Sequence, residues 1–324
     1  MTTHLCRFVA FIIFSLFHHR ILFADGSSIG GRHSYSLTTF DPSGNLDQVG
    51  RAARASMLGA PIVALSILSS SSSSEESIVT APESESTSSP PDEGIYMCIP
   101  LRFLGTTSPL IIDDGTPRIV PISSSICICH TGVGADGRVL CDVAVRLALD
   151  YRYVYGEEIS LEELLEALAE KVQEMTMKAG CRPYGCALLV ACLGSGNVDG
   201  SDKGGEATMY RIDPSGSVEL LNANNNNFNT ENGRRSSVAF LGKWNRQKEQ
   251  DLRTQFESKQ YTNEQQVQDA LISAVEKNDD STPMQSKPTD VGCKQTFLYA
   301  SFTRKGGLRI SRITREKLGD VTSS

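Results

Sequence analysis

The sequence lacks most of the residue patterns by which hydrolases are recognised. Its 324 residues include five histidines, and four of them fall within the first 33 residues. Only His130 lies in the body of the chain, so a Ser–His–Asp or Cys–His hydrolase would need it as the general base. Because His130 ends an apolar run, we interpret it instead as a strand-end histidine whose ring nitrogens are hydrogen-bonded.

Metal-binding and nucleotide-binding motifs are also missing. The nine cysteines include no C-x-x-C and no Cys/His pair at zinc spacing. Cys127 and Cys129 alternate with isoleucines, which predicts one strand with both thiols on the same face. The GVGADG stretch at 132–137 lacks the Lys-Ser/Thr of a P-loop, so we interpret it as a turn at the start of a helix. The sequence therefore predicts no metal, no cofactor, and cysteines buried in a reducing compartment.

An excess of positive charge is absent as well. The chain has 31 Lys and Arg against 38 Asp and Glu, a formal net charge of −7. Such a balance argues against a nucleic acid as the main partner, because phosphate backbones are bound by basic surfaces.

The apolar run at 7–17 is too short for stable membrane insertion, which needs about 20 residues. It has the length of a signal-peptide core, and Ala24-Asp25-Gly26 offers a small-x-small cleavage site that would leave Ser27 first. His18-His19-Arg20 interrupts this pattern, and a misassigned gene start would give a similar extension. Residues 1–26 are therefore either a signal peptide or a spurious extension.

The remainder is organised as a single domain over residues 33–320. Ser, Glu and Pro dominate 66–93, which predicts a disordered low-complexity insertion. Shorter polar stretches at 194–206, 222–235 and 276–290 separate periodic segments, so we interpret them as expanded turns.

Hydrophobic periodicity predicts an α+β fold. The segment "SYSLTTF" reads as a strand, DPSG as a turn, and Leu46, Val49, Ala53 and Met57 as a short helix. Further helices are predicted at 136–156, 160–180, 237–256 and 262–278, the second with a Ser160–Glu163 capping box. Strands are predicted at 94–104 and 118–130 as a pair, at 184–194, at 207–221 around a turn, and at 294–302 and 307–314 as a hairpin. This order suits a four-layer αββα sandwich of two antiparallel sheets with a helix pair on each outer side.

The motifs that carry a family resemblance occur in order along roughly residues 33–310. They are SYSLTTFDPSGNLDQV (34–49), TSPLI (107–111), TGVGADGRVL (131–140), DYRYVYGEEIS (150–160), GCRPYGCALLV (180–190) and YRIDPSGSV (210–218). Together they resemble the proteasome α-type subunits, closest to the alpha type-2 branch. The resemblance implies the N-terminal nucleophile hydrolase type of αββα fold, without catalytic residues. It also implies that the opening helix fills the groove that houses the active site in β-type subunits.

The resemblance also implies partners and site residues. Seven α-type subunits form the outer ring of the 20S core particle, above the β subunits, and their N-terminal segments gate the pore for ubiquitin-dependent proteolysis in cytoplasm and nucleus. The corresponding N-terminal helix and gate residues are His33, Tyr35, Phe40, Pro42, Gly44, Gln48 and Arg51. Arg102 falls in the pocket for the tails of regulatory particles.

This chain departs from the family pattern at several of these positions. His33 replaces a family tyrosine, Gly50-Arg51 replaces a Glu-Tyr pair, and Leu101-Arg102 replaces the Lys-Lys pair that many α subunits carry. The resemblance therefore does not by itself predict gate fixation or activator docking for this chain. Gly50 also makes the helix less stable, by about 1 kcal/mol, than alanine would.

Two alternatives stay open beside a structural subunit. One is a hydrolase of the same fold, with its nucleophile exposed by processing at Gly105-Thr106-Thr107 or at Ser27. Cleavage at 105–107 would remove part of the fold, which argues against that version. The other is an exported, divergent paralogue that acts as an interaction protein through the secretory pathway.

Overall fold

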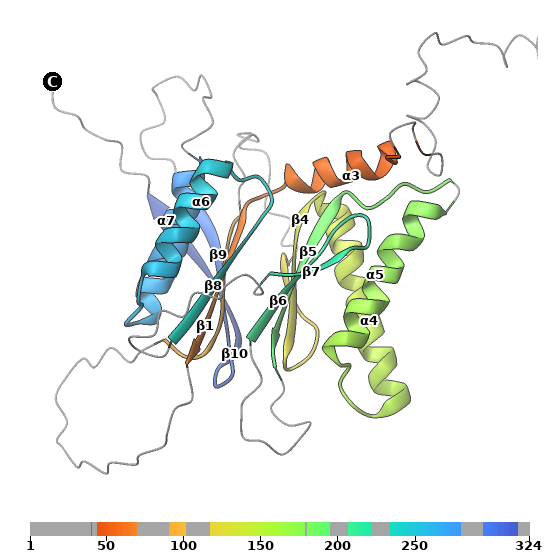
Figure 1. Ribbon diagram of the computed structural model, residues 1–324. Helices are drawn as coiled ribbons and strands as arrows, with labels where there is room; N and C mark the ends of the chain where they lie inside the picture. The colour runs from red at the N-terminus through yellow and green to blue at the C-terminus, as the bar shows by residue number, and fades with distance from the viewer. Residues whose placement is uncertain are drawn as a thin grey trace, which may run out of the picture.

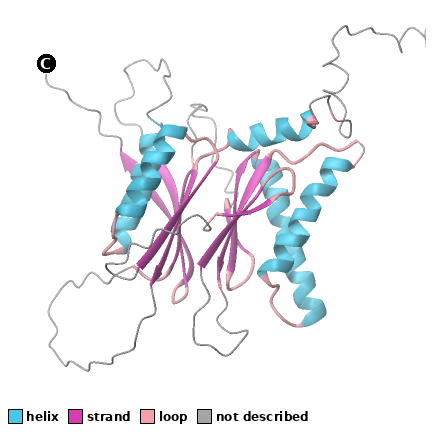
Figure 2. Cartoon of the chain, viewed as in Figure 1, coloured by secondary structure: helices cyan, strands magenta, loops and turns pink. Residues whose placement is uncertain are grey.

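Two five-stranded antiparallel sheets lie face to face, and helices cover the outer face of each (Figure 1, Figure 2). The structure is a computed structural model that describes residues 40, 44–69, 91–101, 117–178, 180–194, 207–221, 234–279 and 294–316. The predicted four-layer αββα sandwich is confirmed. Among the described helices, none is both long and apolar enough to cross a lipid bilayer.

The two sheets differ in how far apart their strands lie along the chain. The first sheet has the order β10-β9-β2-β1-β8 and the second the order β3-β4-β5-β6-β7. The first contains β1 (Ile62–Ser69), β2 (Gly94–Pro100), β8 (Arg234–Leu241), β9 (Lys294–Thr303) and β10 (Gly307–Glu316). The second contains β3 (Ile119–Pro121), β4 (Ile126–Gly132), β5 (Cys186–Leu193), β6 (Ala207–Ile212) and β7 (Val218–Leu220). The first sheet thus joins strands from both ends of the domain.

Among the described helices, α4 (Gly134–Tyr155), α5 (Leu161–Met177), α6 (Arg246–Ser258) and α7 (Glu264–Asp279) form the outer layers, and α3 (Asp47–Met57) lies apart from them (Figure 1). The first sheet is covered by α6 and α7, and the second by α4 and α5. The remaining helix, α3, crosses one end of the sandwich.

Three apolar clusters hold the layers together. The central one lies between the sheets and contains Ile62, Met97 and Leu189, all without solvent exposure. The outer clusters lie between each sheet and its helix pair. Cys127 and Cys129 both belong to the central cluster, so the prediction that their thiols share one face is confirmed.

The predicted helix at 237–256 is wrong in its first part. Residues 234–241 form β8, which pairs with β1, and α6 begins only at Arg246. Val238 packs toward the helices, whereas Ala239 and Leu241 pack between the sheets. A strand buried on both faces reads as a continuous apolar run, which periodicity does not distinguish from a buried helix.

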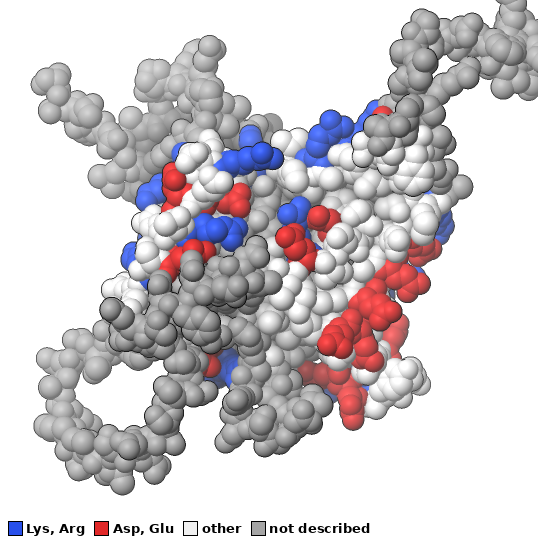
Figure 3. Space-filling model, in the orientation of Figure 1, with Lys and Arg blue, Asp and Glu red and all other residues white. Residues whose placement is uncertain are grey.

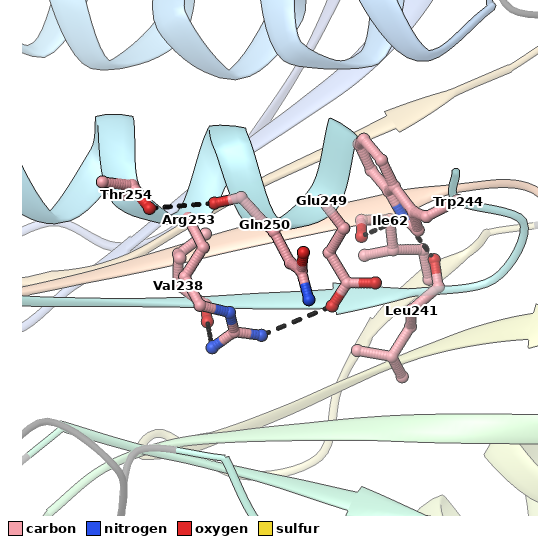
Figure 4. A network of polar contacts seen from close by, with 8 residues as sticks. All are labelled: Ile62, Val238, Leu241, Trp244, Glu249, Gln250, Arg253 and Thr254. Atoms are coloured by element: carbon pink, nitrogen blue, oxygen red, sulfur yellow. Dashed lines mark hydrogen bonds and ion pairs between the residues drawn. The ribbon is translucent and has the colours of Figure 1, made fainter. Parts of the chain in front are cut away.

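Polar contacts fasten α6 to β8 (Figure 4). Arg253 donates to the Val238 carbonyl at 3.4 Å and pairs with Glu249, one turn earlier in α6, at 3.4 Å. The Trp244 indole N–H lies 2.9 Å from the Leu241 carbonyl oxygen and 3.2 Å from that of Ile62. The turn between β8 and α6 is thereby tied to β1 as well.

The predicted bounds of the low-complexity insertion and of the polar segments also need correction. β1 was not predicted, and it runs to Ser69, inside the segment assigned to the 66–93 insertion. A serine-rich end can belong to a strand here because the buried Ser66 and Ser237 hydroxyls hydrogen-bond across it at 2.7 Å. Two of the other polar segments likewise overlap regular structure at one end: 222–235 reaches into β8, and 276–290 begins within α7.

The predicted pairing of 94–104 with 118–130 is also wrong. β2 pairs with β1 and β9 in the first sheet. β3 and β4 form a hairpin of their own in the second sheet. Neighbouring strands in sequence usually pair, but here the chain changes sheet between residues 101 and 117.

The Ser160–Glu163 capping box of α5 is confirmed. The Ser160 hydroxyl accepts from the Glu163 N–H at 3.3 Å and donates to the Glu163 carboxylate at 2.9 Å. We expect Ser160→Ala to lower the free energy of unfolding by about 1 kcal/mol, because an orphan N–H then loses its partner. Urea denaturation of the purified chain measures this. The control is Ser258→Ala, at the C-terminal end of α6, which should change the free energy of unfolding by less than about 0.5 kcal/mol. Equal losses for the two variants would contradict the capping role.

Candidate functional site

Helix α3 covers the end of the sandwich where β1 and β5 begin and β4 and β8 end (Figure 1). Ala52 and Ser56 are buried on its inner side, while Arg51 and Arg54 are exposed on its outer side. Its first turn has no side-chain cap. Docking onto the sheets, rather than capping, therefore has to stabilise this short helix.

Glycines let the backbone after α3 touch the second sheet. A Cβ added at Gly59 would lie 1.9 Å from the Gly132 nitrogen. A Cβ at Gly132 would lie 2.4 Å from the Gly185 carbonyl oxygen and 2.9 Å from the Ser56 Cα. Gly132 also has φ +103°, which side chains rarely adopt. No larger residue fits these positions without moving α3 away from β4 and β5.

Hydrogen bonds fix the same segment to both sheets. The Thr131 hydroxyl, at the end of β4, donates to the Ala60 carbonyl at 2.7 Å. The Lys243 N–H, just after β8, donates to the Gly59 carbonyl at 3.0 Å. Gly242, with φ +84°, makes this approach feasible, because a Cβ there would lie 2.3 Å from the Ala60 oxygen. The connection from α3 to β1 is thus bound from two sides.

A buried carboxylate organises the turn beside α3. Asp136 accepts two hydrogen bonds from the Arg182 guanidinium, at 2.6 and 2.8 Å, and one from the Gly185 N–H at 2.8 Å. Burial by itself raises the pKa of Asp136, but the hydrogen bonds from Arg182 and Gly185 outweigh it and lower the pKa overall. The Arg-Pro-Tyr-Gly motif therefore positions Gly185, which the chain after α3 needs.

His130 is buried, but it is not the hydrogen-bonded histidine that we expected. Neither ring nitrogen has a hydrogen-bond partner among the described residues. The ring packs against α4 at Gly137, where an added Cβ would lie 2.1 Å from Nδ1. Burial, helped by the charge of Arg118, lowers the pKa of His130 to about 4. The side chain is therefore a neutral packing group at physiological pH.

The thiols near this end are poor nucleophiles. Burial raises the pKa of Cys186 to about 12, with the charge of Asp136 adding to it. Burial likewise raises the pKa of Cys141 to about 12 and raises that of Cys129 well above its usual value. The described part of the chain also contains no group of three His, Cys, Asp or Glu side chains placed to hold a metal ion.

The residues predicted for the gate region are only partly placed. Gly44 has φ +83°, Gln48 is half-buried in α3, and Arg51 is exposed there. Phe40 is 60% exposed. His33, Tyr35, Pro42 and Arg102 lie outside the described residues, as do the alternative nucleophiles Ser27, Thr106 and Thr107.

Several residues that build this site were missed in the sequence. They are Gly59, Gly242 and Trp244, and also Thr131, which was visible only as the first residue of the 131–140 motif. Each is near a strand end, but their partners lie far away in sequence, so no local pattern indicates the contacts. Gly132 and Gly185 were visible only as parts of motifs.

Comparisons with known proteins agree with the motif resemblance. A family model described as proteasome subunit matches residues 104–224. A Trypanosoma brucei brucei protein named proteasome subunit alpha type-2 is 30% identical over 242 residues, covering 75% of this chain and 80% of its own length. A Caenorhabditis elegans protein of the same name is 30% identical over 189 residues, covering 58% of this chain and 65% of its own length. A Schizosaccharomyces pombe protein named probable proteasome subunit alpha type-2 is 27% identical over 274 residues, covering 81% of this chain and 89% of its own length.

His130 gives a prediction for the pH dependence of stability. Because its folded pKa of about 4 is below the unfolded value near 6.5, the unfolded chain binds more protons between these values. The free energy of unfolding should therefore fall as the pH drops through this window. From pH 7 to 4.5 we expect the natural chain to lose about 2 to 3 kcal/mol more than His130→Leu. Urea denaturation at both pH values measures this, and identical losses would contradict the account.

Asp136 gives a second prediction. We expect Asp136→Asn to lower the free energy of unfolding by about 1.5 to 3 kcal/mol, because charge-assisted bonds to Arg182 and Gly185 are lost. The control is Asp213→Asn, which breaks the ion pair of a more exposed carboxylate with Arg211 and should cost less than about 1 kcal/mol. Chemical denaturation at pH 7 compares the two. A cost for Asp136→Asn no larger than that of the control would show that the motif is not organised by this carboxylate.

Proposed function

Because the chain belongs to the proteasome subunit family, in its α-type branch, we propose that it is a structural subunit of the outer ring of the 20S core particle. It would there support ubiquitin-dependent protein degradation. The observation that carries the proposal is α3, which is seated over the end of the sandwich (Figure 1) and is followed by Gly59 and Ala60, whose carbonyls accept hydrogen bonds from Lys243 and Thr131. A helix in this position covers the ends of β4 and β5.

We also propose that the chain performs no chemistry of its own. The Thr131 hydroxyl at the covered end is buried and donates to Ala60. Neither ring nitrogen of His130 is hydrogen-bonded to a nucleophile among the described residues, and burial keeps the neighbouring thiols protonated. Peptide-bond cleavage would then belong to the β subunits of the particle.

The outer surface of α4 and α5 supports contacts with neighbouring subunits. Tyr153 is 91% exposed at the end of α4, and Leu149, Val154 and Tyr155 are exposed beside it. Exposed acidic residues lie along the neighbouring α5, namely Glu162, Glu163, Glu166 and Glu170. Acidic side chains also gather on this side of the molecule in Figure 3. Exposed apolar groups in such number usually mark protein interfaces. We propose that other α subunits or β subunits cover this end of α4.

The residues before α3 are proposed to keep the family's gate position. This gate region comprises His33, Tyr35, Phe40, Pro42 and Gly44, together with Gln48 and Arg51 in the first turns of α3. Arg102 is proposed to meet the carboxylate tails of regulatory particles, with Arg geometry in place of lysine. Residues 33–320 would form the single domain, working in cytoplasm and nucleus.

Native purification of the tagged, full-length chain from its own cells tests the assembly. We expect the other α subunits and the β subunits to co-purify in stoichiometric amounts, as measured by mass spectrometry. A chain that begins near Ser27 and comes without these subunits would instead support the exported paralogue, and then Ser27 would be tested as a nucleophile.

A variant sharpens this test. We expect Tyr153→Asp to lower the recovery of the other subunits at least about tenfold, because a buried, unpaired charge would enter the interface. Tyr153→Phe keeps the ring and is the control, with recovery like that of the natural chain. Since the side chain is exposed, both variants should fold normally by circular dichroism. Equal recovery with both would show that this surface is not an interface.

A further inference from the structure

A groove of about 280 Å³ lies between α6 and α7, on the side of the first sheet away from α4 and α5. Its lining residues come from both helices and from the turn that joins them. This volume is near the lower end of ligand pockets, which are about 300 to 1,000 Å³. It accommodates one large side chain with the backbone on either side of it.

The floor of the groove is apolar. Leu252 and Phe256 of α6 and Tyr261 of the turn are buried and belong to the cluster between this helix pair and the sheet. Opposite them, α7 contributes Ala270 and Ala274, whose small side chains leave the space open. A bulky apolar side chain would therefore bury its surface here.

Two lysines of the lining, Lys259 and Lys277, lie at opposite ends of this floor. α6 and α7 run in opposite directions, so Lys259 lies near the start of α7 and Lys277 near the start of α6. The second placement is supported by Lys248 of α6, whose ammonium donates to the Lys277 carbonyl. The Lys259 ammonium lies 5.6 Å from the centre of the Tyr261 ring. Neither Lys259 nor Lys277 forms an ion pair with a described residue through its ammonium group.

The acidic residue of the lining already has a cationic partner. Asp269 pairs with Arg315 of β10, which also pairs with Glu276 of α7 at 3.8 Å. The groove thus presents two unpaired positive charges on a chain whose net charge is −7. Anionic groups on both sides of an apolar side chain would complement it.

We propose that the groove between α6 and α7 is a docking site for a short acidic peptide segment of a partner protein. A bulky apolar residue of that segment occupies the floor, and carboxylates on either side meet Lys259 and Lys277. This inference does not rest on ring assembly, because the groove residues are distinct from the exposed end of α4.

The test uses the purified full-length chain and a fluorescein-labelled hexapeptide, DDLFDD, in fluorescence anisotropy at low salt. We expect saturable binding that NNLFNN and DDGGDD do not show. The double variant Lys259→Gln/Lys277→Gln should bind about five- to tenfold more weakly, because two charge pairs are lost. Lys171→Gln/Lys305→Gln removes the same charge elsewhere and should stay within about twofold of the natural chain.

A steric variant separates the groove from general charge attraction. Ser273→Phe fills the groove without changing its charge and should abolish saturable binding. Binding that survives Ser273→Phe, or that falls equally in both lysine double variants, would overturn the proposal. Absence of saturable binding to the natural chain would overturn it as well. Co-purification with ring subunits should be the same for the natural chain and the groove variants.

Discussion

The close contact between the end of α3 and both sheets is the constraint on which the rest of the structure depends. Gly59, Gly132 and Gly185 meet backbone to backbone, and the Gly59 and Ala60 carbonyls accept hydrogen bonds from the two sheets. A sandwich of two sheets has an open end wherever helices do not cover it. Here the chain itself closes that end, at the point where β1 enters the core.

At this closed end, polar side chains are used for packing and for hydrogen bonds within the fold. His130 sits under α4 against Gly137 and stays neutral, and Thr131 uses its hydroxyl to hold the segment after α3. Asp136 is engaged with Arg182 and Gly185. Thr131 and Asp136 therefore hold the closed end together by hydrogen bonds, and His130 packs beneath it as a neutral ring.

Much of this architecture could be predicted from local pattern. The Ser160–Glu163 box and the apolar stripe of α5 are encoded within a few residues, and the structure confirms both. The helix α3 is confirmed as well, but its buried residues are Ala52 and Ser56, whereas Met57 of the predicted stripe is 53% exposed. The errors arose where the deciding partner is distant. β8 looks helical until β1 is placed beside it, and Ser66 looks disordered until Ser237 supplies its hydrogen bond. The glycine contacts of the site could not be predicted for the same reason, since their partners are distant in sequence. The burial of His130 without a hydrogen-bond partner likewise has no signature in a single sequence.

Hydrogen–deuterium exchange of the full-length chain tests the central claim most directly. If α3 is docked as described, amides of residues 47–57 should exchange with protection similar to that of the first turns of α4. A helix that is undocked has little stability of its own at this length. Exchange of these amides at the rate of an unfolded segment, with α4 protected, would contradict the account.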